Sequence, residues 1–297
     1  MAFSITTKSL IYALLCVLIW SFIPVISRIG QASLDNFQFL FWSNVFSMIA
    51  VILTALFMKK TPTQLFNLSK SIYWKVFILG GLDCLFYLLL YYGYTLENGI
   101  AVLVIQYSWP LLIIGLSVIL LKDRLTLGQI IGVILGFIAV IITFTKGNIT
   151  EIAVDNPQAL LLVFAGAFCF ALMSVLSKQF SLDAYMSTVW LFIFSTLVSL
   201  ILMLMFSEFK LPDSPSWLSV VLNGVLINGV SYILWFKAMS SGESTKIASI
   251  VFLSPVLSMI WLVVIFHDPF VIAYAVGLGL VLIAGILCIR AKSGRKD

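Results

Sequence analysis

The sequence predicts an all-α membrane protein with ten transmembrane helices, arranged as two inverted five-helix repeats. Of its 297 residues, 62% are hydrophobic and only 10% are charged, whereas soluble domains are about 45–50% apolar. Ten apolar runs are each long enough to cross a membrane, and the second half of the chain repeats the first. The composition therefore excludes a soluble enzyme.

The ten apolar runs define the expected elements. A helix needs about 20 apolar residues to cross the hydrocarbon core, and a helix satisfies all of its own backbone groups in lipid. We therefore expect one helix in each run. The runs are residues 10–27, 37–58, 75–94, 100–121, 127–144, 159–178, 186–207, 217–239, 246–266 and 271–290.

The repeat is visible as a constant spacing between the two halves. Residues 83–140 align with residues 228–285 at a spacing of 145 without a gap, and short upstream blocks align at spacings of 150 and 148. We assign residues 1–150 to the first five-helix repeat and residues 151–297 to the second. Because five is an odd number, the second repeat crosses the membrane in the opposite direction. The equivalent pairs include Asp83 with Asn228, Tyr87 with Tyr232, Pro110 with Pro255, Asp123 with Asp268, Arg28 with Lys178, Asp35 with Asp183 and Trp42 with Trp190.

The positive charges predict the orientation of the protein. If the N-terminus is cytoplasmic, only Arg28, Lys146 and Lys210 of the 17 lysines and arginines lie on the outer side, and 14 lie on the inner side. Cytoplasmic loops carry such an excess of positive residues. We expect both termini in the cytoplasm and a multi-pass protein of the cell inner (plasma) membrane. The bias also explains the net charge of +5 without a nucleic-acid partner.

The first run contains a candidate substrate-binding residue, Trp20, followed by a candidate hinge, Pro24. Proline removes one intrahelical hydrogen bond and frees a carbonyl group, which is tolerated in a membrane where a neighbour or a cavity satisfies it.

The third run contains Asp83, the one carboxylate well inside an apolar run. An ionisable residue at such a depth is a functional hypothesis by default. Tyr87 and Tyr91 follow at four-residue steps, so they share its helical face. The eighth run repeats this face with Asn228, Tyr232 and Trp235. We expect the two faces to meet across the midplane as an aromatic substrate cavity. The alternative is that Asp83 and Asn228 only hydrogen-bond neighbouring helices.

The fourth and ninth runs each contain a central proline, Pro110 and Pro255. We expect both to be kinks or hinges. Gln106, Tyr107 and Trp109 precede Pro110 and add hydrogen-bonding groups and aromatic surface, so they complete the set of candidate substrate-binding residues.

The fifth run has Gly128, Gly132 and Gly136 on one helical face, a stripe that lets another backbone approach closely. We expect helix packing within the chain, with a dimer interface as the alternative, and hence a monomer or a weak homodimer. The four cysteines lie singly in apolar runs and indicate neither a disulfide framework nor a metal site. No cofactor is indicated.

Several segments, taken in order, resemble the EamA-type transporters of the drug/metabolite transporter superfamily. They are Ile19-Trp20-Ser21, Tyr91-Tyr92-Gly93-Tyr94, Pro110 followed by Lys122-Asp123-Arg124-Leu125, Gly132 to Gly136, Ala238-Met239, Pro255 and Asp268. The segment Gln106-Tyr107-Ser108-Trp109-Pro110 is similar to the Asn-Tyr-Leu-Trp-Pro element of the aromatic amino-acid exporter branch, with Gln for Asn and Ser for Leu. The resemblance implies an alternating-access carrier whose central cavity is formed by helices one, three, four, six, eight and nine.

Paired repeats of this kind build many secondary transporters, with the substrate held between the repeats near the midplane. We therefore expect a secondary transporter that exports small metabolites, first of all aromatic or neutral amino acids, through the lipid bilayer. The alternatives are an importer or exchanger of a nucleotide-like compound such as S-adenosylmethionine, or a non-transporting membrane scaffold. An enzyme is not expected, because no metalloprotease motif, paired membrane aspartate or Ser/His combination occurs in the apolar runs.

Overall fold

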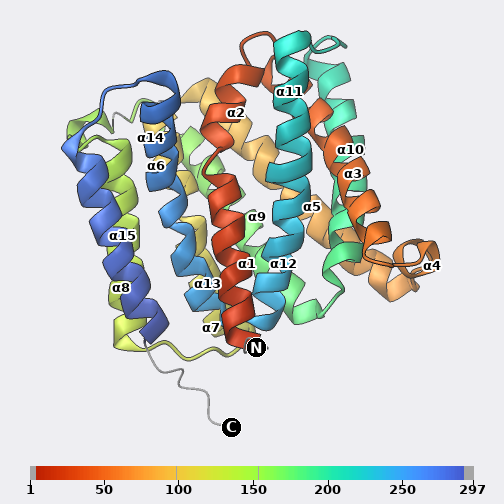
Figure 1. Cartoon of the computed structure of the whole chain (residues 1–297), viewed down its shortest axis with the longest axis horizontal. Helices are drawn as coiled ribbons and strands as arrows, with labels where there is room; N and C mark the ends of the chain where they lie inside the picture. The colour runs from red at the N-terminus through yellow and green to blue at the C-terminus, as the bar shows by residue number, and fades with distance from the viewer. Residues whose placement is uncertain (1–4, 98, 153, 291–297) are drawn as a thin grey trace.

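The computed structural model describes residues 5–97, 99–152 and 154–290, and within them it forms helices and no strands. Figure 1 shows the helices as one bundle. The helices of the first half are α1 (Ile5–Trp20), α2 (Ile23–Gly30), α3 (Asn36–Phe57), α4 (Pro62–Phe66), α5 (Lys70–Leu96), α6 (Gly99–Gln106), α7 (Trp109–Leu120) and α8 (Leu127–Phe144). The second half contains a short 3-10 turn (Ile149–Glu151), α9 (Pro157–Phe180), α10 (Ala184–Phe206), α11 (Ser214–Leu222), the π-helix η2 (Asn223–Val230), α12 (Ser231–Ser241), α13 (Ser244–Val251), α14 (Leu253–Phe266) and α15 (Ile272–Arg290).

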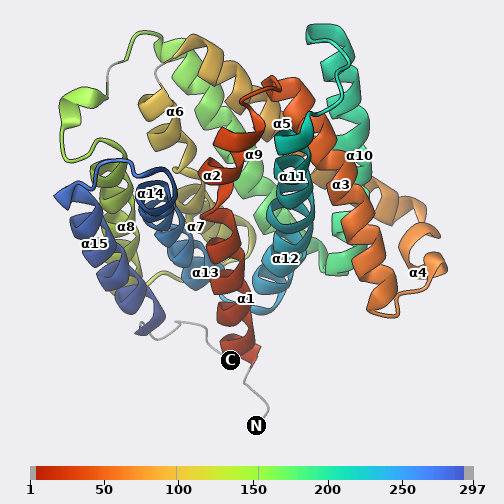
Figure 2. The ribbon, with the colours of Figure 1, turned by 45° about the horizontal axis from the view of Figure 1, so that its top comes forward.

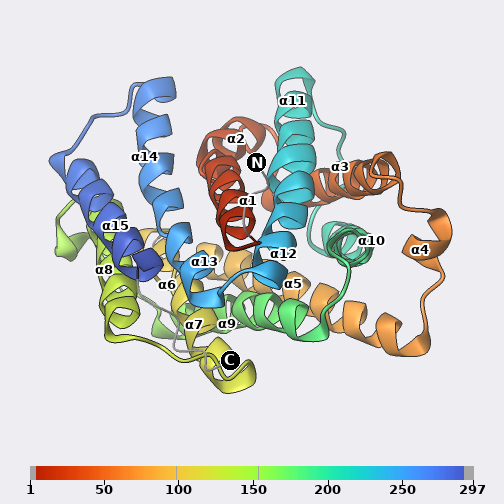
Figure 3. The ribbon, with the colours of Figure 1, turned by 60° about the horizontal axis from the view of Figure 1, so that its bottom comes forward.

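These helices combine into ten spans that are long and apolar enough to cross a membrane, which confirms the expected fold class. The pairs α1–α2, α6–α7 and α13–α14 each form one span, and α11, η2 and α12 together form the eighth. The repeat-equivalent helices α1 and α9 run in opposite directions through the bundle (Figure 2). Figure 3 shows α8 beside α15 at one edge and α10 beside α3 towards the other.

Equivalent contacts occur at the two ends of the bundle. Asp35 caps α3 by accepting from the Phe37 and Gln38 amides, and Asp183 caps α10 by accepting from the Tyr185 and Met186 amides. Each aspartate also binds a residue of the other half: Asp35 accepts from Ser207, and Asp183 pairs with Lys60 at 2.7 Å. Trp42 Nε1 donates to the Lys210 carbonyl at 2.8 Å, and Trp190 Nε1 donates to the Leu65 carbonyl at 2.9 Å. The duplication therefore recurs as similar contacts of equivalent residues at the two ends of the bundle.

Three spans are interrupted next to the prolines that the sequence singled out. The breaks lie between α1 and α2, between α6 and α7, and between α13 and α14, and Pro24, Pro110 and Pro255 lie in the first turn of the following helix. A proline is tolerated there because the first amides of a helix have no intrahelical acceptor. The broken helices are thus observed, and the hinge role of the prolines stays a prediction.

The glycine stripe of α8 is used within the chain. A Cβ on Gly132 would lie 2.6 Å from Cys288 Sγ, and one on Gly136 would lie 2.4 Å from the Phe252 ring. On the facing helix, a Cβ on Gly277 would lie 2.2 Å from Thr143 Oγ1. Gly132 and Gly136 therefore pack α8 against α15 and the ninth span, in agreement with the packing interpretation.

The orientation is testable because the start of α1 and the end of α15 lie on the same face (Figure 1). We expect this face to be cytoplasmic. Asn67, which follows α4 in a predicted inner loop, and Lys146, which follows α8 in a predicted outer loop, are both exposed. An impermeant thiol reagent applied to intact cells should label Lys146→Cys and leave Asn67→Cys unlabelled until the cells are opened. The reverse pattern would overturn the orientation.

Candidate substrate site

Aromatic rings from both repeats pack together at the centre of the bundle. Trp20 of α1 lies 6.1 Å from Trp109 of α7 and 5.4 Å from Trp235 of α12, measured between ring centres. Phe170 of α9 lies 4.8 Å from Trp109 and 5.0 Å from Phe86 of α5. All five residues are buried. We call these rings, together with Tyr232, the aromatic cluster.

Polar groups fix the orientation of two of the indoles. Trp20 Nε1 donates to Ser231 Oγ at 2.7 Å, and Trp235 Nε1 donates to Ser174 Oγ at 3.0 Å. The N–H of Trp109 has no hydrogen-bond partner within the described part of the chain. Because a buried indole usually finds a partner for its N–H, Trp109 is the ring of the cluster that retains a donor for a ligand.

Asp83 lies at the middle of α5 and against this cluster. Its carboxylate is 1% exposed and accepts two hydrogen bonds, from Ser195 Oγ to Oδ2 at 3.1 Å and from Tyr232 OH to Oδ1 at 3.1 Å. The Tyr87 and Tyr232 hydroxyls lie 3.2 Å apart. Since the Tyr232 proton is directed to Asp83, the Tyr87 hydroxyl donates to Tyr232. The two repeat-equivalent tyrosines therefore meet where the repeats meet.

A cavity of about 580 Å³ adjoins the Asp83 network. It lies between α3, α5, α9 and α10, within the range of about 300–1,000 Å³ that is usual for small-molecule sites. Tyr87 and Ser195 line it and also belong to the Asp83 network, while Asn36 and Phe206, at the predicted outer ends of α3 and α10, mark its other end. The cavity thus extends from the midplane through the predicted outer half. Its remaining lining includes Asn44, Cys84, Leu88, Leu162, Ser199 and Leu202.

The structure brings together six of the candidate residues, whereas Gln106 and Tyr107 make other contacts. Gln106 accepts from Tyr94 OH at 3.4 Å, and the ring of Tyr107 packs on Phe144 of α8 at 5.5 Å. Asn228 lies in η2, and its side chain has no hydrogen-bond partner in the described part of the chain. The side chain of Tyr91 is outside the described residues. The residues that meet are Trp20, Asp83, Tyr87, Trp109, Tyr232 and Trp235.

Two central residues were missed by the sequence reasoning. Phe170 contacts Trp20, Trp109 and Phe86, and it is equivalent to Trp20 at the spacing of 150. The repeat alignment was therefore a signal for it. Ser195 is a hydrogen-bond donor to Asp83, and nothing in the sequence distinguishes it from the other serines of its helix.

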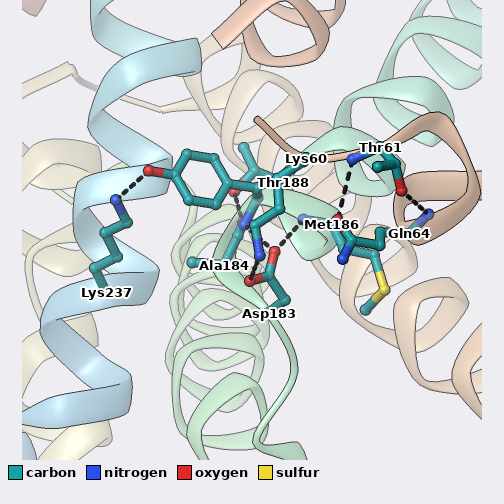
Figure 4. Close-up of polar contacts among 9 residues, drawn as sticks. Lys60, Thr61, Gln64, Asp183, Ala184, Met186, Thr188 and Lys237 are labelled. Atoms are coloured by element: carbon teal, nitrogen blue, oxygen red, sulfur yellow. Dashed lines mark hydrogen bonds and ion pairs between the residues drawn. The ribbon is translucent and has the colours of Figure 1, made fainter. Parts of the chain in front are cut away.

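Lysine side chains form an ion pair and hydrogen bonds at the predicted inner end of the bundle. Figure 4 shows Lys60 reaching Asp183 at the start of α10, and Lys237 of α12 pointing towards the same helix, where it donates to the Tyr185 hydroxyl. Lys178, at the end of α9, donates to the Gly242 carbonyl at 2.6 Å and to Ser244 Oγ at 3.1 Å. The Lys60–Asp183 pair joins the two repeats at this end, whereas the contacts of Lys237 and Lys178 lie within the second repeat.

A duplicated ten-span bundle with broken helices and a polar network between the repeats is the architecture of a membrane transporter. The chain belongs to the EamA-like transporter family, which it matches over residues 7–145 and again over residues 157–290. It is accordingly a multi-pass protein of the inner membrane, and its family is one of transporters rather than enzymes.

Several relatives show how far the similarity extends. The uncharacterized transporter YyaM of Bacillus subtilis (strain 168) is 29% identical over 157 residues, which is 51% of this chain and 52% of that protein. An uncharacterized transporter of Archaeoglobus fulgidus is 24% identical over 96% of this chain and 98% of its own length. The aromatic amino acid exporter YddG of Ancylobacter novellus is 24% identical over 54% of this chain and 56% of its own length. The chain thus aligns with only about half the length of YyaM and of YddG.

One solved crystal structure superimposes with a TM-score of 0.85 over 97% of this chain and 99% of its own chain, at 18% sequence identity. This likeness shows the fold.

Proposed function

We propose that the protein is a secondary transporter that moves small metabolites out of the cell by alternating access, and that aromatic or neutral amino acids are its main substrates. The observation that carries the proposal is the buried Asp83 carboxylate, which accepts from Tyr232 and Ser195 and lies against rings from both repeats, while Tyr87 bonds to its repeat equivalent Tyr232. An ionisable group at the bilayer midplane is costly and marks substrate or ion pathways. The exporter named among the relatives supports the same substrate class.

Each group of candidate residues has a role in this proposal. The rings of Trp20, Trp109 and Trp235 provide flat apolar surface for a side chain, and a well-stacked ring contributes about 0.5–1.5 kcal/mol beyond area burial. Asp83 binds the ammonium group or takes up a coupling proton. Gln106, Tyr107 and Asn228, together with Tyr91, contact the substrate when the spans move apart at the hinges Pro24, Pro110 and Pro255. The cavity beside Tyr87 is the outer end of the path.

Two measurements test the proposal. A thermal-shift screen of the purified protein with amino acids, nucleosides and S-adenosylmethionine identifies the ligand, since a ligand at 100 times its Kd stabilises the folded state by about 2.7 kcal/mol. Flux of that ligand is then measured in proteoliposomes. We expect an aromatic or neutral amino acid to raise the Tm and to be transported. If only a nucleoside or S-adenosylmethionine raised the Tm, the substrate would belong to that class instead of the amino acids. Absence of flux for every ligand that binds would contradict the proposal of transport.

Trp109→Ala provides the site-specific variant in the same assay. It removes the ring that retains a free donor, so we expect flux per mole of folded protein to fall about two- to tenfold. Trp74→Ala is the matched control, because Trp74 is 63% exposed at the predicted inner end of α5. Equal flux per folded protein in both variants would show that Trp109 only packs the core.

A further inference from the structure

Three residues that line the cavity have repeat equivalents that contact one another at the predicted inner end. The cavity residues belong to α3, α9 and α5, and their equivalents belong to α10, α1 and α12. The pairs, at repeat spacings of 148, 150 and 145, are Phe37 with Tyr185, Leu162 with Tyr12, and Tyr92 with Lys237. The repeat symmetry therefore assigns the inner counterpart of the cavity to the place where α1, α10 and α12 meet.

At this inner position, Lys237 lies between the two tyrosines. Its ammonium lies 4.2 Å from the centre of the Tyr185 ring and 5.7 Å from the centre of the Tyr12 ring, and it donates to the Tyr185 hydroxyl. An ammonium within about 6 Å of a ring centre is attracted to the face of the ring. Tyr12 belongs to the first repeat and Lys237 to the second, so their contact joins the two repeats.

The two equivalent positions differ in exposure. Tyr92 and Leu88, which line the cavity, are 54% and 36% exposed. Lys237 is half-buried, and Ile233, the equivalent of Leu88, is 4% exposed. Side chains therefore cover the inner position, whereas the outer one is hollow.

The charge of Lys237 is stabilised by tyrosines and not by an acid. In the part of the chain that the structure describes, no carboxylate lies within ion-pair distance of its Nζ, and the nearby Asp183 pairs with Lys60. A lysine within a membrane span is costly unless polar groups or the bundle interior accommodate it. The contacts of Lys237 come from α1 and α10, so they exist only while these helices lie close to α12.

Access in a carrier built from inverted repeats alternates when one repeat moves against the other around a fixed site. We infer that Tyr12, Tyr185 and Lys237 are positioning residues that form the inner gate of the transport path. While Lys237 contacts both tyrosines, the inner position is filled and the cavity lies in the outer half. When these contacts break, a space equivalent to the cavity opens at the inner end. The inference rests on the proposed alternating-access transport.

Two thiols report on the two positions without a known substrate. Cys84 lines the cavity. Thr188 is the equivalent of the cavity residue Leu40 and is 0% exposed, so Thr188→Cys places a shielded thiol at the inner position. The rate at which N-ethylmaleimide modifies each thiol is measured by mass spectrometry of its peptide. Opening of the inner gate should raise the rate at position 188 without raising the rate at Cys84, whereas general loosening of the fold should raise both.

Tyr185→Phe is the test variant in this Thr188→Cys chain. It removes the hydroxyl that accepts from Lys237 and keeps the ring. We expect the modification rate at position 188 to rise about two- to tenfold, the range for the loss of one hydrogen bond, and the rate at Cys84 not to rise.

Two further variants show whether the effect comes from the gate. Tyr73→Phe is the matched control, because the Tyr73 hydroxyl donates to the Phe66 carbonyl at 3.1 Å, also at the predicted inner end. It should leave both rates unchanged. In a Lys237→Met background no ammonium is available to the Tyr185 hydroxyl, so adding Tyr185→Phe should have no further effect there.

Three results would overturn the inference. They are a rate at position 188 that Tyr185→Phe and Tyr73→Phe change equally, a rise at both thiols, and an effect of Tyr185→Phe that is the same with and without Lys237. Flux by the native chain is measured separately in proteoliposomes. A missing gate with intact flux is therefore distinguishable from failure of the proposed transport.

Discussion

Replacement of Asp83 by asparagine is expected to lower transport at least about tenfold while the folded protein is retained. Asparagine has the same shape, its carbonyl oxygen still accepts from one of the two hydroxyls, and its amide donates to the other. The change therefore removes the charge and leaves the packing. A hydrogen bond to a charged group contributes about 1.5–3 kcal/mol, and 1.4 kcal/mol corresponds to a factor of ten.

The pH profile of the Asp83→Asn variant distinguishes the two roles that Asp83 can have. If the carboxylate binds a substrate ammonium, affinity should fall at every pH. If it carries a coupling proton, binding should be retained and the pH dependence of flux should disappear. Asp155→Asn serves as the control, because this exposed side chain has no partner in the described part of the chain. Affinity, rate and pH profile all equal to those of the control would show that Asp83 is structural.

Replacement of Gly224 by alanine is expected to have the largest effect on stability. Its Cβ would lie 2.5 Å from the Ser43 carbonyl oxygen and 2.5 Å from Phe46 Cβ of α3. Backbone atoms cannot rotate away, so η2 and α3 must separate. Overpacking of this kind costs about 1–3 kcal/mol, and we expect a lower Tm of the purified protein and a lower yield of monodisperse material.

Gly81→Ala is the matched control for Gly224→Ala. It lies in a long helix, α5, and a Cβ there would meet nothing within 4 Å. Alanine is favoured over glycine in a helix by about 1 kcal/mol, so the Tm of Gly81→Ala should stay the same or rise. If both variants had the same Tm, the close contact between η2 and α3 would not be a determinant of stability.

The sequence predicted the ten spans well because crossing a bilayer depends on local properties. Length and apolar content decide whether a run spans the membrane. Both can be evaluated from the run itself, without knowing which helices pack against it. The breaks at Pro24, Pro110 and Pro255 were predictable for the same reason, since a proline disturbs its own helix. The eighth span contains an irregularity that the local sequence properties did not predict. The π-helix η2 is a rare form, and it has no counterpart in the equivalent part of α5.

The candidate site was predicted in part. The repeat placed Tyr87 opposite Tyr232, and their hydroxyls do meet. Asp83 was recognised as the central carboxylate, but its donor Ser195 and the packing residue Phe170 were not. Gln106 and Tyr107 adjoin Trp109 in sequence, yet their side chains contact Tyr94 and Phe144 instead. Residues next to each other on a broken helix point in different directions, so adjacency in sequence did not place them together.

The segments that cross the membrane, the breaks in three of them and the equivalent residues of the two halves can all be derived from the amino-acid sequence. The three-dimensional arrangement was needed to find that the central rings pack on one another, that the cavity lies between α3, α5, α9 and α10, and that Arg28 and Lys178 bind partners unrelated by the repeat. This difference arises because hydrophobicity and repeat spacing can be evaluated along the chain without knowing which helices pack together. The contacts depend on how each helix is rotated about its axis and how closely its small residues let a neighbour approach.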